Sequence, residues 1–161
     1  MSSFTHIDDN GRVRMVDVTD KKSTVRTAVA GGTVSMKPET LTMIADQKVK
    51  KGNVLETARI AGVMAAKKTS DLIPMCHPLK LTHVQVDFEA NNADHCIDIK
   101  ASVRTIDQTG VEMEALTAVS AAALTIYDMC KSYDRDMRIS DIRLLEKTGG
   151  KSGTFIRKPD H

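Results

Sequence analysis

The sequence predicts an α+β fold in which an antiparallel sheet carries helices on one face. Residues 82–90 alternate between apolar and polar side chains, and residues 97–103 repeat this alternation after an Asn-Asn-Ala-Asp turn, which predicts a β-hairpin. A long apolar segment with helical character follows, and the remaining segments complete the order strand, helices, strand, strand, helix, strand. This is the split βαβ order of a ferredoxin-like sandwich.

Two strands are expected before the hairpin. Residues 24–36 are rich in Val and Thr and form the first strand of the core, although the pair Gly31-Gly32 interrupts them. A second, short strand is expected at residues 15–19.

Helices are expected between these strands and the hairpin. Proline is favoured in the first turn of a helix, so a short helix begins at Pro38 and ends near residue 47. Asn53 and Glu56 have the spacing of a capping box, and this second helix continues to about residue 68.

The second half of the chain contributes one long helix and a closing strand. Thr109 and Glu112 again have capping-box spacing, which predicts a helix that continues to about residue 133. Residues 137–147 predict the closing strand, and their imperfect alternation allows a bulge.

The long helix is apolar around its whole circumference, a pattern typical of a helix buried on more than one side. One face is expected to meet the sheet. The other face, rich in Ala and Ser, is expected to meet another subunit, which predicts a homo-oligomer. The alternative is that the alanines serve only as good helix formers.

Composition bounds the class of protein. The 161 residues correspond to one domain, with an N-terminal extension (1–23), a core (24–147) and a flexible glycine- and lysine-containing C-terminal segment (148–161). The net charge is only +2 and aromatic residues are 3% of the chain, which disfavours a generic nucleic-acid binder and a ring-stacking platform. No apolar run approaches the length of a membrane span.

Cysteine usage indicates the cellular compartment. The three cysteines are an odd number without a CxxC pair, and no secretory signal is visible at the N-terminus. We therefore expect a cytoplasmic protein with free thiols.

Asp128 and Lys131 are the first candidate for chemistry, because their i, i+3 spacing places them on one helix face. The spacing allows two interpretations. The pair is either an exposed ion pair near the helix C-terminus, or a general acid and base in which partial burial lowers the pKa of the lysine.

Glu114 lies on roughly the same helix face, fourteen positions before Asp128, so the two stand about 21 Å apart along the axis. They cannot act on the same small group within one chain. Antiparallel packing of this helix against its two-fold mate would bring them together, and a site shared between subunits is our hypothesis.

The segment Pro74-Met75-Cys76-His77-Pro78 holds a histidine in a loop stiffened by proline at both ends. His77 has two interpretations, a binding-site residue or a hydrogen-bonded structural histidine. The spacing of the histidines and cysteines does not favour a metal site, so we expect no metal and no cofactor.

Residues 149–153 contain the letters GGKSG but are not a Walker loop, since Leu145 stands where its first glycine should be. Lys147 and Lys151 beside this glycine loop could still contact phosphate. Taken without any family resemblance, the residues also fit a ferredoxin-like RNA-binding module or a small ligand-binding regulatory domain. Phe88 is the only aromatic residue that the hairpin offers to the first of these.

Several longer motifs resemble one family, the cyclic pyranopterin monophosphate synthases or molybdenum cofactor biosynthesis protein C family. They are residues 51–54 (KGNV), 57–62 (TARIAG), 71–79 (DLIPMCHPL), 109–117 (TGVEMEALT), 123–131 (ALTIYDMCK) and 147–153 (KTGGKSG). The resemblance extends from His6 to Gly153. Met75 stands where leucine is common, a near-isosteric change.

The resemblance implies a ferredoxin-like subunit in a homohexamer, a trimer of dimers with the active site at a subunit interface. It implies a lyase that converts 3′,8-cyclo-7,8-dihydroguanosine 5′-triphosphate, the product of an upstream radical SAM enzyme, to cyclic pyranopterin monophosphate with release of pyrophosphate.

The resemblance also implies roles for individual residues. The catalytic residues would be Asp128 and Lys131 as an acid–base pair, assisted by Lys51 and Lys147. The substrate would be lined by Met75, Cys76, His77, Met113 and Glu114, and its phosphates by Lys67, Arg26 and Lys151.

Overall fold

The computed structural model describes residues 6–8 and 10–158. Its elements follow the predicted order, with two short additions. They are β1 (Thr24–Ser35), α1 (Pro38–Ala45), α2 (Val54–Lys67), α3 (Thr69–Leu72), β2 (Leu81–Asn91), β3 (Cys96–Asp107), α4 (Glu112–Cys130), β4 (Arg138–Thr148) and β5 (Phe155–Ile156).

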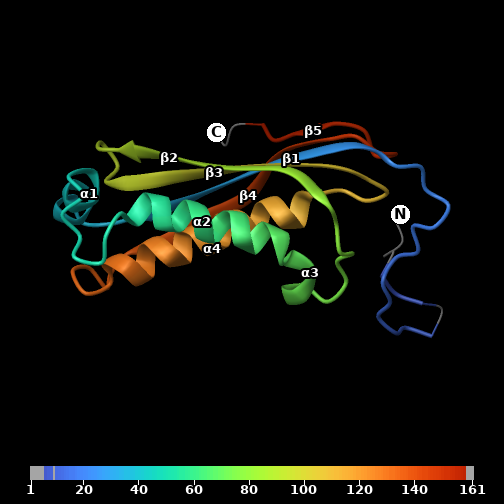
Figure 1. The fold of residues 1–161 in the computed structure, drawn as a ribbon, viewed down its shortest axis with the longest axis horizontal. Helices are drawn as coiled ribbons and strands as arrows, with labels where there is room; N and C mark the ends of the chain where they lie inside the picture. The colour runs from blue at the N-terminus through green and yellow to red at the C-terminus, as the bar shows by residue number, and fades with distance from the viewer. Residues whose placement is uncertain (1–5, 9, 159–161) are drawn as a thin grey trace.

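The strands form one antiparallel sheet in the order β2-β3-β1-β4-β5. Helices α2 and α4 lie against one another on one face of this sheet (Figure 1). The predicted α+β ferredoxin-like class is therefore confirmed, including the placement of the helices on one face.

The local signals for helix starts had different outcomes. Asn53 is the N-cap of α2, and its side chain accepts a hydrogen bond from the Glu56 backbone amide (3.1 Å), as the capping box predicts. The capping box predicted at Thr109 is wrong. Helix α4 begins at Glu112 behind Val111, whose side chain makes no capping hydrogen bond.

One prediction about a short segment is wrong, and two short elements were not predicted. The strand expected at residues 15–19 is absent, because this stretch follows an isolated bridge between Ile7 and Val13 and pairs with no strand of the sheet. Helix α3 and strand β5 were not predicted. Each is four residues or fewer, too short to show a period in the sequence.

Strand β4 contains the expected irregularity. Its pairing with β1 shifts register twice, between Val29 and Ala30 and between Gly31 and Thr33. Asp141 lies at the second shift with a positive φ of 57°. Close packing against α4 requires glycine at position 32, since a Cβ there would lie 2.7 Å from the Val119 side chain.

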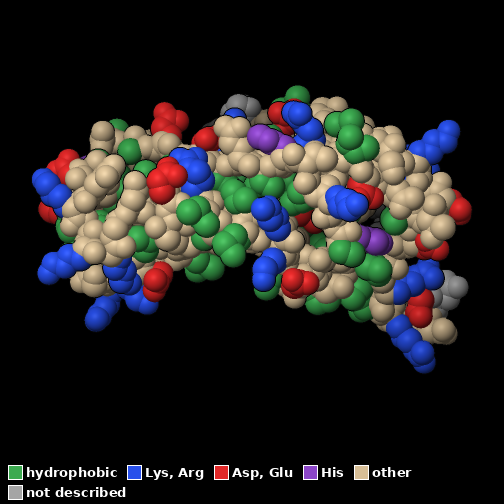
Figure 2. All heavy atoms as spheres, viewed as in Figure 1, with side chains coloured by type: hydrophobic (Ala, Val, Ile, Leu, Met, Phe, Trp, Pro, Cys, Tyr) green, Lys and Arg blue, Asp and Glu red, His purple; other side chains and the backbone are tan. Residues whose placement is uncertain are grey.

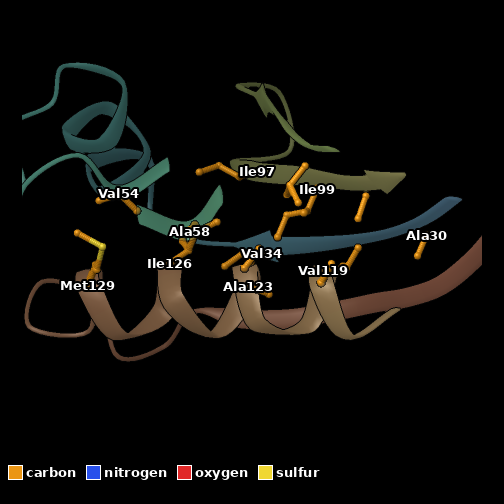
Figure 3. Close-up of a cluster of buried hydrophobic side chains, with 14 of the residues drawn as sticks. Ala30, Val34, Val54, Ala58, Ile97, Ile99, Val119, Ala123, Ile126 and Met129 are labelled. Atoms are coloured by element: carbon orange, nitrogen blue, oxygen red, sulfur yellow. The ribbon is translucent and has the colours of Figure 1, made fainter. Parts of the chain in front are cut away.

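Helix α4 is buried by two layers of its own chain. Val119, Ala123 and Ile126 point into the cluster that includes Val34 of β1 and Ile97 of β3 (Figure 3). A neighbouring side of α4 meets α2 so closely that a Cβ on Gly62 would lie 3.0 Å from the Ala118 carbonyl.

Contact with α2 therefore explains part of the apolar surface of α4 that was expected to contact another subunit. Leu124 of α4 nevertheless stays 61% exposed in the subunit, and Ile60 and Met64 of α2 are also exposed. The oligomeric state remains a prediction.

Candidate active site

Three charged residues meet at the C-terminal end of α4, and we call them the Asp128 cluster. The Lys131 ammonium donates a hydrogen bond to Asp128 Oδ1 (2.6 Å). Lys51, from the loop before α2, donates to the Asp128 backbone carbonyl (2.7 Å) and lies 3.7 Å from Oδ2. A lysine three residues away and a lysine 77 residues away in the sequence thus both contact Asp128.

The two cations hold the pKa of the Asp128 carboxyl below its usual value, with the Lys131 hydrogen bond as the main cause. All three side chains are about half exposed in the subunit. Partial burial of Lys131, on which the acid–base interpretation relied, is therefore modest within one chain. Once a ligand covers the cluster, the carboxylate can accept a proton, and the two ammonium groups can bind an anion or donate a proton.

A second group of side chains surrounds a cavity of about 310 Å³ at the other end of α4, which we call the Glu114 cavity. It brings together all five residues that the resemblance assigns to the substrate. The full lining is His6, Val16, Val18, Lys21, Met75, Cys76, His77, Leu79, Thr109, Gly110, Glu112, Met113 and Glu114.

Burial controls the electrostatics of this cavity. Glu114 is only 4% exposed, and the loss of hydration raises its pKa to about 7. Burial also raises the pKa of the Cys76 thiol, with a smaller contribution from Glu114. At neutral pH the cavity therefore offers a carboxyl group close to its pKa, which is suited to proton transfer, beside a thiol that stays protonated.

His77 makes a structural contact from within the cavity wall. Its Nε2 donates to the backbone carbonyl of Val16 (2.8 Å) and so joins the proline-flanked loop to the N-terminal segment. Both of the interpretations given above apply in part, because His77 lines the cavity and one of its ring nitrogens already has a protein partner.

A third set of residues surrounds the basic cavity, a hollow of about 570 Å³ beside β1. Arg26 and Lys151 both line it, as the resemblance implies. The full lining is Lys21, Lys22, Thr24, Arg26, Gly150, Lys151 and Ser152, so four cations and no carboxylate surround it among the described residues. This composition fits a polyanionic ligand.

The glycine loop shapes this cavity. Gly149 and Gly150 have positive φ values of 91° and 74°. A Cβ on Gly150 would overlap the Arg26 guanidinium, so the loop needs glycine to pack on that side chain. Arg26 Nη2 donates to the Gln108 carbonyl (3.1 Å), and its buried Nε has no hydrogen-bond partner among the described residues.

The four remaining predicted lysines lie in three different places. The Lys147 ammonium donates to the Ser152 hydroxyl at the rim of the basic cavity, and Lys51 and Lys131 lie in the Asp128 cluster. Lys67 is the exposed last residue of α2 and lines neither cavity.

Sequence reasoning missed the contribution of the N-terminal segment to both cavities. Val16 and Val18 were expected only as part of a short strand, and Lys21 and Lys22 belong to no motif. The contacts that place these residues beside Glu114 and Arg26 come from distant parts of the chain. The adjacent lysines at positions 21 and 22, just before the first core strand, were the only sequence feature that could have indicated an anion-binding role for this segment.

Charge on the surface is mixed. Figure 2 shows Lys and Arg side chains interspersed with Asp and Glu over the helix face. No group of three or more metal-ligating side chains exists in the part of the chain that the structure describes. Among those residues, no helix has the length and apolar character needed to cross a membrane.

Comparison with known proteins adds the family. A family model described as the MoaC family matches residues 15–150. A protein from Desulforapulum autotrophicum named cyclic pyranopterin monophosphate synthase is 65% identical over 97% of this chain and 96% of its own length. Proteins with the same name from Desulfatibacillum aliphaticivorans and a Roseiflexus species are 63% and 61% identical over 98% and 97% of this chain, and each match covers 99% of the relative.

These matches cover the strands and helices that form both cavities and the Asp128 cluster. They identify an enzyme of the lyase class with a function in molybdenum cofactor biosynthesis. The chain belongs to the MoaC family.

Proposed function

We propose that this enzyme converts 3′,8-cyclo-7,8-dihydroguanosine 5′-triphosphate to cyclic pyranopterin monophosphate and releases pyrophosphate. The observation that carries the proposal is the adjacency of two cavities, which share Lys21 in their linings. One contains a buried carboxyl group with a pKa near neutrality, and the other is lined by four cations. A nucleotide-derived substrate has the same two parts, a heterocycle that exchanges protons and a polyphosphate.

In the Glu114 cavity we assign the ring of the substrate to Met75, Cys76, His77, Met113 and Glu114. The cavity offers thioether and thiol contacts instead of aromatic stacking, in agreement with the scarcity of aromatic residues. Glu114 can hold or release a proton at a ring nitrogen near neutral pH.

The phosphate step requires positive charge. A hydroxyl oxygen of the substrate attacks the α-phosphorus, its proton passes to a base, and the bond to the β-phosphate oxygen breaks, so that pyrophosphate leaves with the electron pair. We assign Arg26 and Lys151 to the phosphates, with Lys147 at the rim, because cations stabilise the charge that develops on the leaving group. Lys67 would have to reach the phosphates from the end of α2.

Asp128 and Lys131 are the proposed acid–base pair, with Lys51 in support. Their cluster lies about 21 Å from Glu114 along α4, too far to act on a ligand in the same subunit's Glu114 cavity. We therefore propose that a two-fold-related subunit supplies its Asp128 cluster to this cavity, within a hexamer built as a trimer of dimers. The exposure of the three side chains in the single chain supports this arrangement, since a partner and substrate can cover them.

The test is a coupled assay with the purified chain. Substrate is generated by a radical SAM enzyme acting on GTP, freed from that enzyme, and incubated with the wild-type chain while pyrophosphate is measured. We expect stoichiometric release of pyrophosphate and formation of the cyclic monophosphate. Binding of the substrate without pyrophosphate release would instead support a ligand-binding regulatory domain. The reaction is proposed to take place in the cytoplasm, where three free thiols remain reduced.

A further inference from the structure

We propose that Lys21, which the resemblance leaves without a role, binds the phosphate nearest to the ring, the one that remains in the cyclic product. Lys21 would therefore bind both substrate and product, whereas the other cations of the basic cavity would bind only the pyrophosphate that leaves. This inference rests on the proposed function, since it takes from it a ligand with a ring at one end and phosphates at the other.

The position of Lys21 between the cavities is the first argument. Among the described residues, Lys21 is the one found in the linings of both the Glu114 cavity and the basic cavity. A ligand that places its ring beside Glu114 and its terminal phosphates beside Arg26 must therefore pass Lys21. The part of the ligand at that junction is the link between the ring system and the first phosphate.

Charge supplies the second argument. Among the described residues that line the Glu114 cavity, Lys21 is the only lysine or arginine, and two carboxyl groups, Glu112 and Glu114, lie on the same lining. A phosphate at the mouth of this cavity faces like charge unless a cation lies beside it. Lys22, in contrast, lines only the basic cavity, where Arg26 and Lys151 share the same task.

Hydrogen bonds fix the segment before Lys21, although this segment belongs to no helix or strand. His77 Nε2 donates to the Val16 carbonyl (2.8 Å). The Asp17 carboxylate accepts hydrogen bonds from the Thr19 amide (2.9 Å) and hydroxyl (2.7 Å), and the Lys21 amide donates to the Val18 carbonyl (2.9 Å). The loop that carries His77 therefore fixes the turn that presents Lys21.

The experiment compares Lys21→Ala with the matched neighbour Lys22→Ala, using full-length protein and three direct binding measurements by calorimetry. The probes are inorganic pyrophosphate, the cyclic monophosphate product and the triphosphate substrate. Lys100→Ala, on the sheet face opposite the helices, controls for the loss of one positive charge.

We expect Lys21→Ala to weaken product binding about tenfold or more, the size of one charge-assisted hydrogen bond. Lys22→Ala should weaken pyrophosphate binding but change product affinity less than about twofold, a difference well below that of one such hydrogen bond. Lys21→Arg should restore most of the product affinity, because it restores the charge. Lys100→Ala should change none of the three affinities.

The inference is overturned if Lys21→Ala binds the product as the wild type does, or if Lys22→Ala weakens product binding equally. A wild-type chain that releases no pyrophosphate and binds no product contradicts the proposed function, and the inference falls with it. A wild-type chain that does both, together with a Lys21→Ala variant of normal product affinity, contradicts the inference alone.

Discussion

The two ends of α4 carry the same kind of acidic side chain in opposite environments. Glu114, in the first turn, is 4% exposed, and burial raises its pKa to about 7. Asp128, in the last turns, is 61% exposed, and the ammonium groups of Lys131 and Lys51 keep its pKa below the usual value. One helix thus presents a carboxyl group that is partly protonated at neutral pH and one that is fully ionised.

The comparison shows that the surroundings of each carboxyl group, and not its residue type, determine its charge. In the protein interior the lost hydration of the anion dominates, whereas at the surface the neighbouring cations dominate. Paired acidic groups with separated pKa values are a common basis for assigning acid and base roles. Here the two groups lie too far apart in one subunit, so their cooperation depends on the proposed second subunit.

The largest expected effect is on turnover. Asp128→Ala and Lys131→Ala should each lower the rate of pyrophosphate release by about 10²- to 10⁴-fold, the range for loss of a general acid or base. Each variant should retain its fold and oligomeric state, because the side chains are half exposed. Initial rates and size-exclusion chromatography provide the measurements. Normal turnover in either variant would remove that residue from the mechanism.

Mixing variants tests whether the two ends of the helix cooperate across subunits. Unfolded Asp128→Ala and Glu114→Ala chains are refolded together in equal amounts. If the chains form two-fold pairs at random, about one-quarter of the sites contain both intact residues and should recover about one-quarter of wild-type activity. Each variant refolded alone should stay inactive, and failure of the mixture to exceed them would mean that both residues act within one chain, or that one is dispensable.

The third prediction concerns stability at the buried end. The folded-state pKa of Glu114 is raised above the ordinary value of 4.5, so between about pH 4.5 and 7 the folded protein holds a proton that the unfolded chain releases. Wild-type stability should therefore fall as pH rises through this window. The Glu114→Gln variant lacks this dependence, and its stability relative to wild type should increase by up to about 3 kcal/mol across the window.

Denaturant unfolding at several pH values measures this difference. Glu39→Gln, a substitution of an exposed carboxylate in the first turn of α1, serves as the control and should follow the wild-type curve. Parallel curves for Glu114→Gln and wild type would show that Glu114 ionises as easily as an exposed glutamate.

The smallest effect is expected at the exposed end, with the opposite sign. The Asp128 pKa is lowered, so its ionised form contributes stability above about pH 4 that is lost as pH falls through the folded-state value. Asp128→Asn should lower the thermal midpoint by less than about 2 °C at pH 7, because solvent screens an exposed pair. The difference should shrink further towards pH 3, and a midpoint change well above about 2 °C at pH 7 would show that solvent does not screen the cluster.

Much of the fold was accessible from the sequence because its signals are local. Alternation along the hairpin, the Asn53 cap and the apolar length of α4 each depend on a few neighbouring residues, and all three predictions are confirmed. The strand expected at residues 15–19 is wrong, because strand formation needs a hydrogen-bonding partner that local pattern does not reveal. The start of α4 was placed too early for a related reason, since capping-box letters at Thr109 form no cap there.

In the candidate site, too, contacts between neighbouring residues could be predicted from the sequence, and contacts between distant residues could not. The i, i+3 pair of Asp128 and Lys131 could be read from spacing, and the structure contains that contact. The approach of Lys51 to Asp128 joins residues 77 positions apart and has no signature in spacing. The N-terminal lining of the Glu114 cavity is likewise set by a contact from His77 to Val16 across 61 positions.

The sequence by itself determined the order of the elements, the class of fold and, through its long motifs, the family, because these depend on residue pattern along the chain. Tertiary structure alone decided that Glu114 is buried while Asp128 is exposed, and that Lys21 lies between two cavities. The physical reason is that pKa values and ligand sites depend on hydration and on charges brought close by folding, and neither is a property of neighbouring letters.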